Sequence, residues 1–301
     1  MEVSALKAPT DKTNDTIQII VTRACDLFNC SNCTQLLPFR KDPMHMSLEC
    51  FRLACQSIAD WPGIVGIFGG NPCVHPQFEA LMEILVEEIP DQKHRGLWSN
   101  NLMKHGALVQ QVFYPNGRFN LNAHAVPEAA AEIERWLPGR LIRNSGTQEA
   151  WHSAMLVDWA DMGLTYEQWA DKREHCDINT KWSAAIAERD GKPYAYFCEV
   201  AAAIDGVRDA NHGLYAFPGW WRLKMAAFGK QVAGCCDKGC AVPLRIRGHL
   251  DREDVYDVSR SWLPATAAPR GKIKTELHEE LPKDRCKETT DYMRQREFRK
   301  V

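Results

Sequence analysis

Residues 17–33 read Ile-Gln-Ile-Ile-Val-Thr-Arg-Ala-Cys-Asp-Leu-Phe-Asn-Cys-Ser-Asn-Cys. The first six residues form an apolar, β-branched run that predicts a buried strand. The loop that follows carries Cys25, Cys30 and Cys33, separated by four residues and then by two. Thiolates clustered in this way are typical ligands of a metal ion or an iron–sulfur cluster. The stretch therefore predicts a metal centre directly after a strand.

The number of thiols in the loop indicates the kind of centre. Three thiolates can hold three irons of a [4Fe–4S] cluster and leave the fourth iron open to a substrate or cosubstrate. A second group of cysteines lies far downstream and contains enough thiols for a closed site. We expect two metal sites, the second drawn from Cys176, Cys198, Cys235, Cys236 and Cys240.

The composition is that of an ordinary globular protein with many cysteines. The chain has 301 residues, 12 cysteines and a formal net charge of −2, which gives no reason to expect nucleic acid or an anionic membrane as a partner. Its polar start lacks the apolar core of a signal peptide, so we expect a soluble, cytoplasmic protein. In that compartment the cysteines favour metal ligation over disulfides. Cys50, Cys55 and Cys73 lie in or beside apolar helical patterns and are expected in the core.

Strand-like and helix-like runs alternate from residue 16 to about residue 157. This alternation predicts an α/β fold whose parallel βα units close into a full or partial barrel. In such folds the chemistry gathers at the carboxyl ends of the strands. The expected strands are 17–22, 63–68, 95–98 and 118–121, and the expected helices begin near Ser47 and Pro76 or cover 108–113 and 128–136.

The pattern changes after residue 162. A short helix over 166–172 precedes Cys176, and two strand-like runs meet at Asp190-Gly191, a strong hairpin signal. A further helix is expected from Cys198. These changes predict four parts: a polar segment (1–15), a barrel (16–162), a small α+β domain (163–263) and a charged tail (264–301).

The upstream motifs resemble those of radical SAM enzymes. Cys25-x4-Cys30-x2-Cys33 resembles their cluster loop, Gly69-Gly70-Asn71-Pro72 resembles their Gly-Gly-Glu-Pro turn, and Trp98-Ser99-Asn100-Asn101 is similar to their Thr-Asn-Gly turn. The resemblance covers residues 16–160 and implies a partial (β/α)6 TIM-type barrel. It also implies reductive cleavage of S-adenosylmethionine at a [4Fe–4S] cluster. The expected partners are an external one-electron reductant of the flavodoxin or ferredoxin type and a small-molecule or peptide substrate.

The resemblance also implies cofactor-binding residues, with three departures from the family pattern. The first cysteine spacing is four residues instead of three, and Asn32 stands where the family usually has an aromatic residue, a role that Phe28 would take. Asn71 replaces the family's glutamate and would offer a carbonyl oxygen to an ammonium group without a full charge. The implied cofactor contacts are Phe28, Gly69, Gly70, Asn71, Ser99, Asn100 and Asn122.

The downstream cysteines resemble the auxiliary-cluster extensions called SPASM and twitch domains. In those extensions a cysteine, a β-hairpin, a cysteine that opens a helix and a later cysteine pair hold another [4Fe–4S] cluster. The implied ligands are Cys176, Cys198, Cys240 and either Cys235 or Cys236, which fits the twitch type with one auxiliary cluster. That cluster would accept or relay an electron, or order the substrate pocket. Hydrogen abstraction would end in oxidation, epimerisation or cross-linking.

Two other classes of protein remain open at this stage. Cys235, Cys236 and Cys240, together with Cys198 or a histidine, are compatible with a structural zinc site. Both cysteine groups are compatible with a non-catalytic iron–sulfur electron carrier or sensor. The histidines lack metal-ligand spacing and are expected as hydrogen-bonded or surface residues. His124 and Asn122 follow the fourth strand and are candidates to contact cofactor or substrate.

Overall fold

The structure is a computed structural model whose described part covers most of the chain. Of the earlier predictions, those on Phe28 and on most of the charged tail fall outside that part. None of the described helices has the length and apolarity needed to cross a lipid bilayer. The described residues are 6–12, 15–27, 30–39, 44–124, 126–142, 151–176, 179, 183–238, 240–244, 247–250, 255–265 and 272–275.

A seven-stranded sheet with the order β4-β3-β2-β1-β6-β7-β8 organises the fold. Its first four strands are parallel and match the strands predicted from the apolar runs. β1 is buried at every position, as expected for a central strand of a parallel sheet. These strands are β1 (Thr16–Thr22), β2 (Ile64–Gly69), β3 (Arg95–Ser99) and β4 (Arg118–Leu121).

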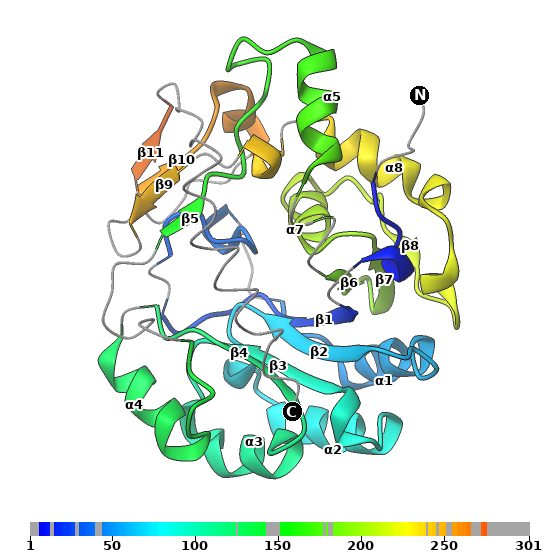
Figure 1. The fold of residues 1–301 in the computed structure, drawn as a ribbon, viewed down its shortest axis with the longest axis vertical. Helices are drawn as coiled ribbons and strands as arrows, with labels where there is room; N and C mark the ends of the chain where they lie inside the picture. The colour runs from blue at the N-terminus through cyan, green and yellow to red at the C-terminus, as the bar shows by residue number, and fades with distance from the viewer. Residues whose placement is uncertain are drawn as a thin grey trace.

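Four helices alternate with these strands and lie together on one side of the sheet (Figure 1). The first begins after Ser47, whose side chain accepts a hydrogen bond from the Cys50 N–H, as predicted for an N-cap. Cys50, Cys55 and Cys73 are buried, which confirms their assignment to the core. The helices are α1 (Leu48–Ser57), α2 (Phe78–Glu88), α3 (Gly106–Phe113) and α4 (Pro127–Trp136).

The predicted hairpin is present, but it extends the same sheet. Asp190 and Gly191 have φ angles of 50° and 73°, as a tight two-residue hairpin turn requires. The first hairpin strand runs parallel to β1, and the second pairs with β8. Residue 163 therefore does not mark a break in the sheet, and a separate α+β domain is not confirmed. The strands are β6 (Ala184–Arg189), β7 (Lys192–Tyr196) and β8 (Leu214–Tyr215).

The sheet is mainly parallel, and β4 and β8 are its edges among the described strands. An α/β fold is thus confirmed, whereas a partial (β/α)6 barrel is not. A parallel bridge between Leu121 and Leu141 adds one pairing beyond β4.

The remaining α-helices and two small sheets lie on the other side of the sheet (Figure 1). Two small sheets join β5 (Trp151–Ser153) with β9 (Arg247–Leu250) and β10 (Val255–Asp257) with β11 (Lys272–Lys274). The helices there are α5 (Tyr166–Glu174), α7 (Glu199–Arg208), α8 (Gly229–Gln231) and the π-helical turn η8 (Val232–Cys236). Short 3-10 turns are η1 (Pro9–Asp11), η2 (Leu37–Phe39), η3 (Pro72–Val74), η4 (Gln92–His94), η5 (Met103–His105), η6 (Trp220–Arg222), η7 (Met225–Phe228), η9 (Val242–Leu244) and η10 (Arg260–Ala265).

A buried histidine fixes the turn that follows β2. His75 is 3% exposed, its Nε2–H donates to the Met46 carbonyl at 3.0 Å, and its Nδ1 accepts the Gln77 N–H at 3.0 Å. Both ring nitrogens are therefore used by the neutral imidazole. Burial is the main cause that lowers the pKa of His75 below its ordinary value of 6.5.

This geometry predicts an acid-sensitive fold. Because the unfolded chain binds a proton at His75 more readily than the folded protein does, the free energy of unfolding should decrease as the pH falls below about 6.5. His75→Gln should flatten this dependence in urea unfolding of the apo-protein between pH 5 and pH 8. His94→Gln, at a half-buried position, is the matched control. An unchanged slope in His75→Gln would contradict the assignment.

Candidate metal centres

Two of the predicted motifs meet where β1 and β2 end. The Gly70 N–H donates to the Thr22 carbonyl at 3.0 Å, and the Asn71 N–H donates to the Ala24 carbonyl at 2.8 Å. A Cβ atom at Gly69 would lie 2.3 Å from the Thr22 oxygen, and one at Gly70 would lie 2.1 Å from the Ala24 oxygen. Glycine is therefore required for this turn to lie against the chain that leads into the cysteine loop. Contact of this pair with a bound cofactor stays a prediction.

The Asn71 side chain is fully used inside the protein. Its Oδ1 accepts hydrogen bonds from the Cys73 N–H at 3.1 Å and from Ser99 Oγ at 2.9 Å. Its Nδ2 donates to Asp26 Oδ1 at 2.6 Å and to the Asn101 carbonyl at 3.1 Å. With two donors already on Oδ1 and no exposed surface, the residue does not offer the free carbonyl expected from the sequence. Ser99 accordingly supports Asn71.

Asp26 is a residue of this site that the sequence reasoning missed. Its exposed carboxylate accepts from Asn71 Nδ2 and, at 2.8 Å, from Asn101 Nδ2. The two amides hold a negative charge beside the turn in which Asn71 replaces a glutamate. The position of this acidic residue directly after Cys25 was the feature of the sequence that could have indicated its place in the site.

Asn100 links the third turn to the cysteine loop. Its Nδ2 donates to Cys25 Sγ at 3.1 Å, and both residues are buried. An amide donor on this sulfur favours its anionic form and orients it for metal binding. Asn100 Oδ1 has no hydrogen-bond partner within the described part of the chain. Because leaving a buried acceptor unsatisfied costs about 1–3 kcal/mol, this oxygen is suited to a ligand that donates a hydrogen bond.

Two histidines lie beside the second cysteine of the loop. His124 Nδ1 is 3.7 Å from Cys30 Sγ, and the His124 ring stacks on His152 with centroids 5.3 Å apart. Donor atoms of these three residues all lie within 4.8 Å of one another. Asn122 Oδ1 accepts the His124 N–H at 3.0 Å and so shapes the turn that carries His124. Because these three residues lie far apart in the sequence, their spacing could not predict that they come together.

The part of the cysteine loop next to Cys33 is anchored by the C-terminal part of the chain. Asn32 Nδ2 donates to Asp257 Oδ2 at 2.7 Å, and its Oδ1 accepts the Asp257 N–H at 2.9 Å. Asn32 has a φ angle of 58°, in the left-handed region that asparagine tolerates. The position before Cys33 therefore ties the loop to β10. Cys25 is buried, whereas Cys30 and Cys33 are half-buried.

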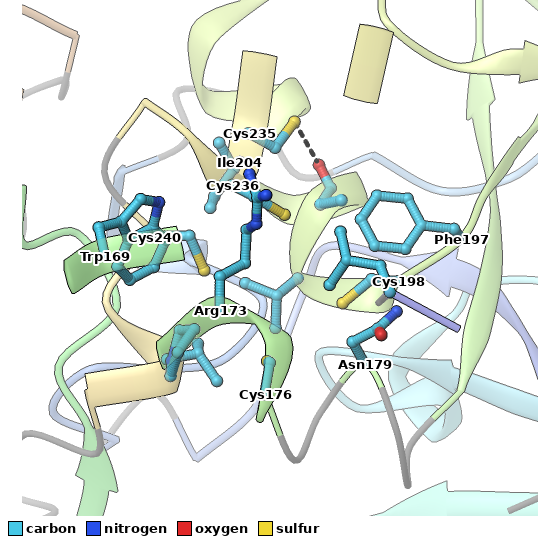
Figure 2. A pocket seen from close by; sticks show the side chains of 15 residues that line it. Trp169, Arg173, Cys176, Asn179, Phe197, Cys198, Ile204, Cys235, Cys236 and Cys240 are labelled. Carbon is cyan, nitrogen blue, oxygen red and sulfur yellow. Dashed lines mark hydrogen bonds between the residues drawn. The ribbon is translucent and has the colours of Figure 1, made fainter. Parts of the chain in front are cut away.

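The downstream cysteines line one cavity (Figure 2). Cys176 follows α5, Cys198 is the N-cap of α7, Cys236 ends the π-helical turn, and Cys240 follows it. Figure 2 shows the sulfur atoms of these four residues turned toward a shared space. The other lining residues are mostly apolar and include Leu6, Trp169, Phe197, Val200, Ala201, Ile204 and Val242.

Cys235 lines the same cavity but its sulfur has other neighbours. Its Sγ donates to the Ala201 carbonyl at 3.5 Å, the interaction drawn as a dashed line in Figure 2. The same sulfur lies within 4.8 Å of donor atoms of Asp205 and His212, which are joined by a 2.8 Å hydrogen bond. Of the two candidates that the sequence left open, the geometry favours Cys236 as the fourth ligand.

The electrostatics of the cavity require compensation of charge when the thiols ionise. Burial raises the pKa of Cys198, Cys236 and Cys240 above the ordinary value, and Lys12 opposes this shift at Cys198. Metal binding removes the thiol protons and supplies the missing positive charge. The buried thiols therefore suit a cationic metal centre.

The spread of the sulfur atoms bears on the kind of metal centre. Among the described residues, no three of the five downstream cysteines have sulfur atoms that all lie within 4.8 Å of one another. A tetrahedral zinc ion with Zn–S bonds of about 2.3 Å would hold its sulfur ligands only about 3.8 Å apart. In the described arrangement, the downstream sulfur atoms are therefore not at the spacing of a zinc site.

The comparisons with known proteins found distant structural neighbours. No family model matches the chain, and no curated protein matches it. A crystal structure of BtrN in complex with AdoMet and 2-DOIA aligns with a TM-score of 0.39 and 13% identity over 63% of this chain and 75% of that chain. Selenomethionine BtrN in an open conformation aligns with a TM-score of 0.38 and 13% identity over 75% of this chain and 88% of that chain.

The different surroundings of the two adjacent cysteines predict different effects of substitution. We expect Cys236→Ser to abolish iron binding at the downstream cavity and Cys235→Ser to retain it, because only the Cys236 sulfur faces the other three. The measurement is the iron content after anaerobic reconstitution in a Cys25→Ala, Cys30→Ala, Cys33→Ala background, where we expect about four irons per chain. Loss of iron in Cys235→Ser alone would reverse the assignment.

Proposed function

We propose that the protein is a radical SAM enzyme with a second, closed iron–sulfur cluster. The observation that carries this proposal is the meeting of the three predicted turns beside the cysteine loop, where Gly70 and Asn71 bond to the chain before Cys25 and Asn100 donates to the Cys25 sulfur. Holding a cluster alone does not require this convergence. A site that binds a cosubstrate next to the cluster does.

The first site fits a cluster with one open position. Cys25, Cys30 and Cys33 would hold three irons, and such a cluster, when bound, supplies the electron that breaks a C–S bond of S-adenosylmethionine. Asn100 orients the Cys25 sulfur and presents its free Oδ1 to a ligand. The Asp26 carboxylate, held by two amides, is suited to accept an ammonium group and supplies the charge that Asn71 lacks.

The second site fits a closed cluster held by Cys176, Cys198, Cys236 and Cys240. Its role in the proposal is to accept or relay an electron or to order the substrate pocket. The substrate class is a small molecule or a peptide, and the product arises by oxidation, epimerisation or cross-linking. An external one-electron reductant and a cytoplasmic location complete the proposal.

A second candidate function is that of a zinc-binding protein without this chemistry. One observation favours it, namely the trio of Cys30, His124 and His152 with donor atoms within 4.8 Å of one another. Cysteine and histidine are the ordinary ligands of structural zinc. Zinc at this trio would block the use of Cys30 in a cluster, so metal analysis separates the two functions.

The proposed function predicts the result of removing the first site. Anaerobically reconstituted wild-type protein should be brown and hold about eight irons per chain, and after reduction with dithionite it should release 5′-deoxyadenosine from S-adenosylmethionine. A Cys25→Ala, Cys30→Ala, Cys33→Ala variant should hold about half as much iron and form no 5′-deoxyadenosine.

The matched control for this experiment is Cys55→Ala, which removes a buried core cysteine outside both groups. It should keep the full iron content and the activity, provided that circular dichroism shows a folded protein. Colourless wild-type protein that contains zinc and no iron, or 5′-deoxyadenosine formation by the triple variant, would contradict the proposal.

A further inference from the structure

Lys12 is a buried cation with no hydrogen-bond partner. The residue is 4% exposed, and within the described part of the chain its Nζ meets no acceptor. Burying an ammonium group without a compensating partner is strongly unfavourable. Because no acceptor among the described residues bonds to it, the Lys12 ammonium group is suited to a bound anionic partner.

Residues 6–12, the segment that carries Lys12, contribute Leu6 to the lining of the downstream cysteine cavity. Leu6 and Asn179 both line the cavity. The Lys7 N–H donates to Asn179 Oδ1 at 2.7 Å, and Asn179 Nδ2 donates to the Lys7 carbonyl at 3.2 Å. Lys12 Nζ lies 6.0 Å from the ring centroid of Phe197, which also lines the cavity and directly precedes Cys198.

The groups that act electrostatically on Lys12 include the sulfur atoms of the cavity. Burial lowers the pKa of Lys12, and the ionised forms of Cys198, Cys176 and Glu199, followed by Cys236, act in the opposite direction. When the Gln18 amide is oriented so that both its oxygen and its nitrogen have partners, its nitrogen donates a hydrogen bond to Glu199 Oε2 at 2.6 Å.

The cation that lines the cavity, Arg173, is already paired. Arg173 lines the cavity, and its guanidinium forms an ion pair with Asp237. Lys12, in contrast, has no hydrogen-bond acceptor among the described residues, and the Cys198 and Cys176 sulfur atoms act on it electrostatically.

We propose that Lys12 is the counter-charge of the downstream metal–thiolate centre and stabilises its more negatively charged, reduced state. This inference rests on the proposed function only in requiring a metal–thiolate centre in that cavity. Four thiolates give such a centre a net negative charge, and reduction by one electron adds to it. A fixed positive charge nearby favours the reduced form and so raises the reduction potential.

The test measures the midpoint potential of the downstream centre in the Cys25→Ala, Cys30→Ala, Cys33→Ala background, which removes the other site. The reconstituted full chain is titrated with dithionite and followed by electron paramagnetic resonance. In Lys12→Met we expect the equilibrium constant for one-electron reduction to fall about tenfold or more, which lowers the potential by at least about 59 mV. Lys12→Arg should stay near the parent value.

The matched control is Lys7→Met, which changes an exposed lysine on the same segment and should leave the potential unchanged. The thermal stability of the metal-free protein gives a second readout, in which Lys12→Met should cause an increase and not a decrease. Because Lys12→Met replaces a buried amine that lacks a hydrogen-bond partner by an apolar side chain, it should raise the apo-protein Tm by about 2 °C or more, an effect that lost packing would not produce.

The outcomes separate this inference from the proposed function. An unchanged potential in Lys12→Met, with iron bound, overturns the role of Lys12 and leaves the second cluster standing. Absence of iron in the parent background overturns both. If folded Lys12→Met fails to hold iron while Lys12→Arg holds it, the requirement for charge is supported, and equal failure of both variants contradicts it.

Discussion

The two candidate centres depend on one buried strand. β1 is inaccessible to solvent at nearly every position and pairs in parallel with β2 on one side and β6 on the other. Cys25 follows the strand by three positions, and Lys12, which lies over the Phe197 ring beside the downstream cavity, precedes it. Because both neighbours hydrogen-bond along its length, the strand fixes the first loop and the segment beside the second cavity at the same time.

Asparagine side chains do much of the positioning at the first site. Asn32, Asn71 and Asn100 each use an amide nitrogen as donor, and the first two also use the carbonyl oxygen as acceptor. An amide can satisfy both kinds of partner without bringing a charge into a buried place. In the proposed function, the charge for an ammonium group would come from Asp26, which the Asn71 and Asn101 amides hold at the surface.

The local elements were predictable from the sequence because they depend on short-range patterns. The apolar run before Cys25, the N-cap Ser47 and the Asp190-Gly191 turn each determine their structure within a few residues. Contacts between distant residues were not predictable in this way. The pairing of β6 with β1, the approach of His124 and His152 to Cys30, and the choice between Cys235 and Cys236 all depend on tertiary packing, which a single sequence does not encode as a period or a spacing.

The central claim is that the two cysteine groups hold two separate iron–sulfur clusters, one of which keeps an iron open to a ligand. Mössbauer spectroscopy of the full chain reconstituted anaerobically with ⁵⁷Fe tests this most directly. The account predicts [4Fe–4S] signals from both sites and a change at one iron of a single cluster when S-adenosylmethionine is added. Spectra that show one cluster only, or two clusters that both ignore the added ligand, would contradict it.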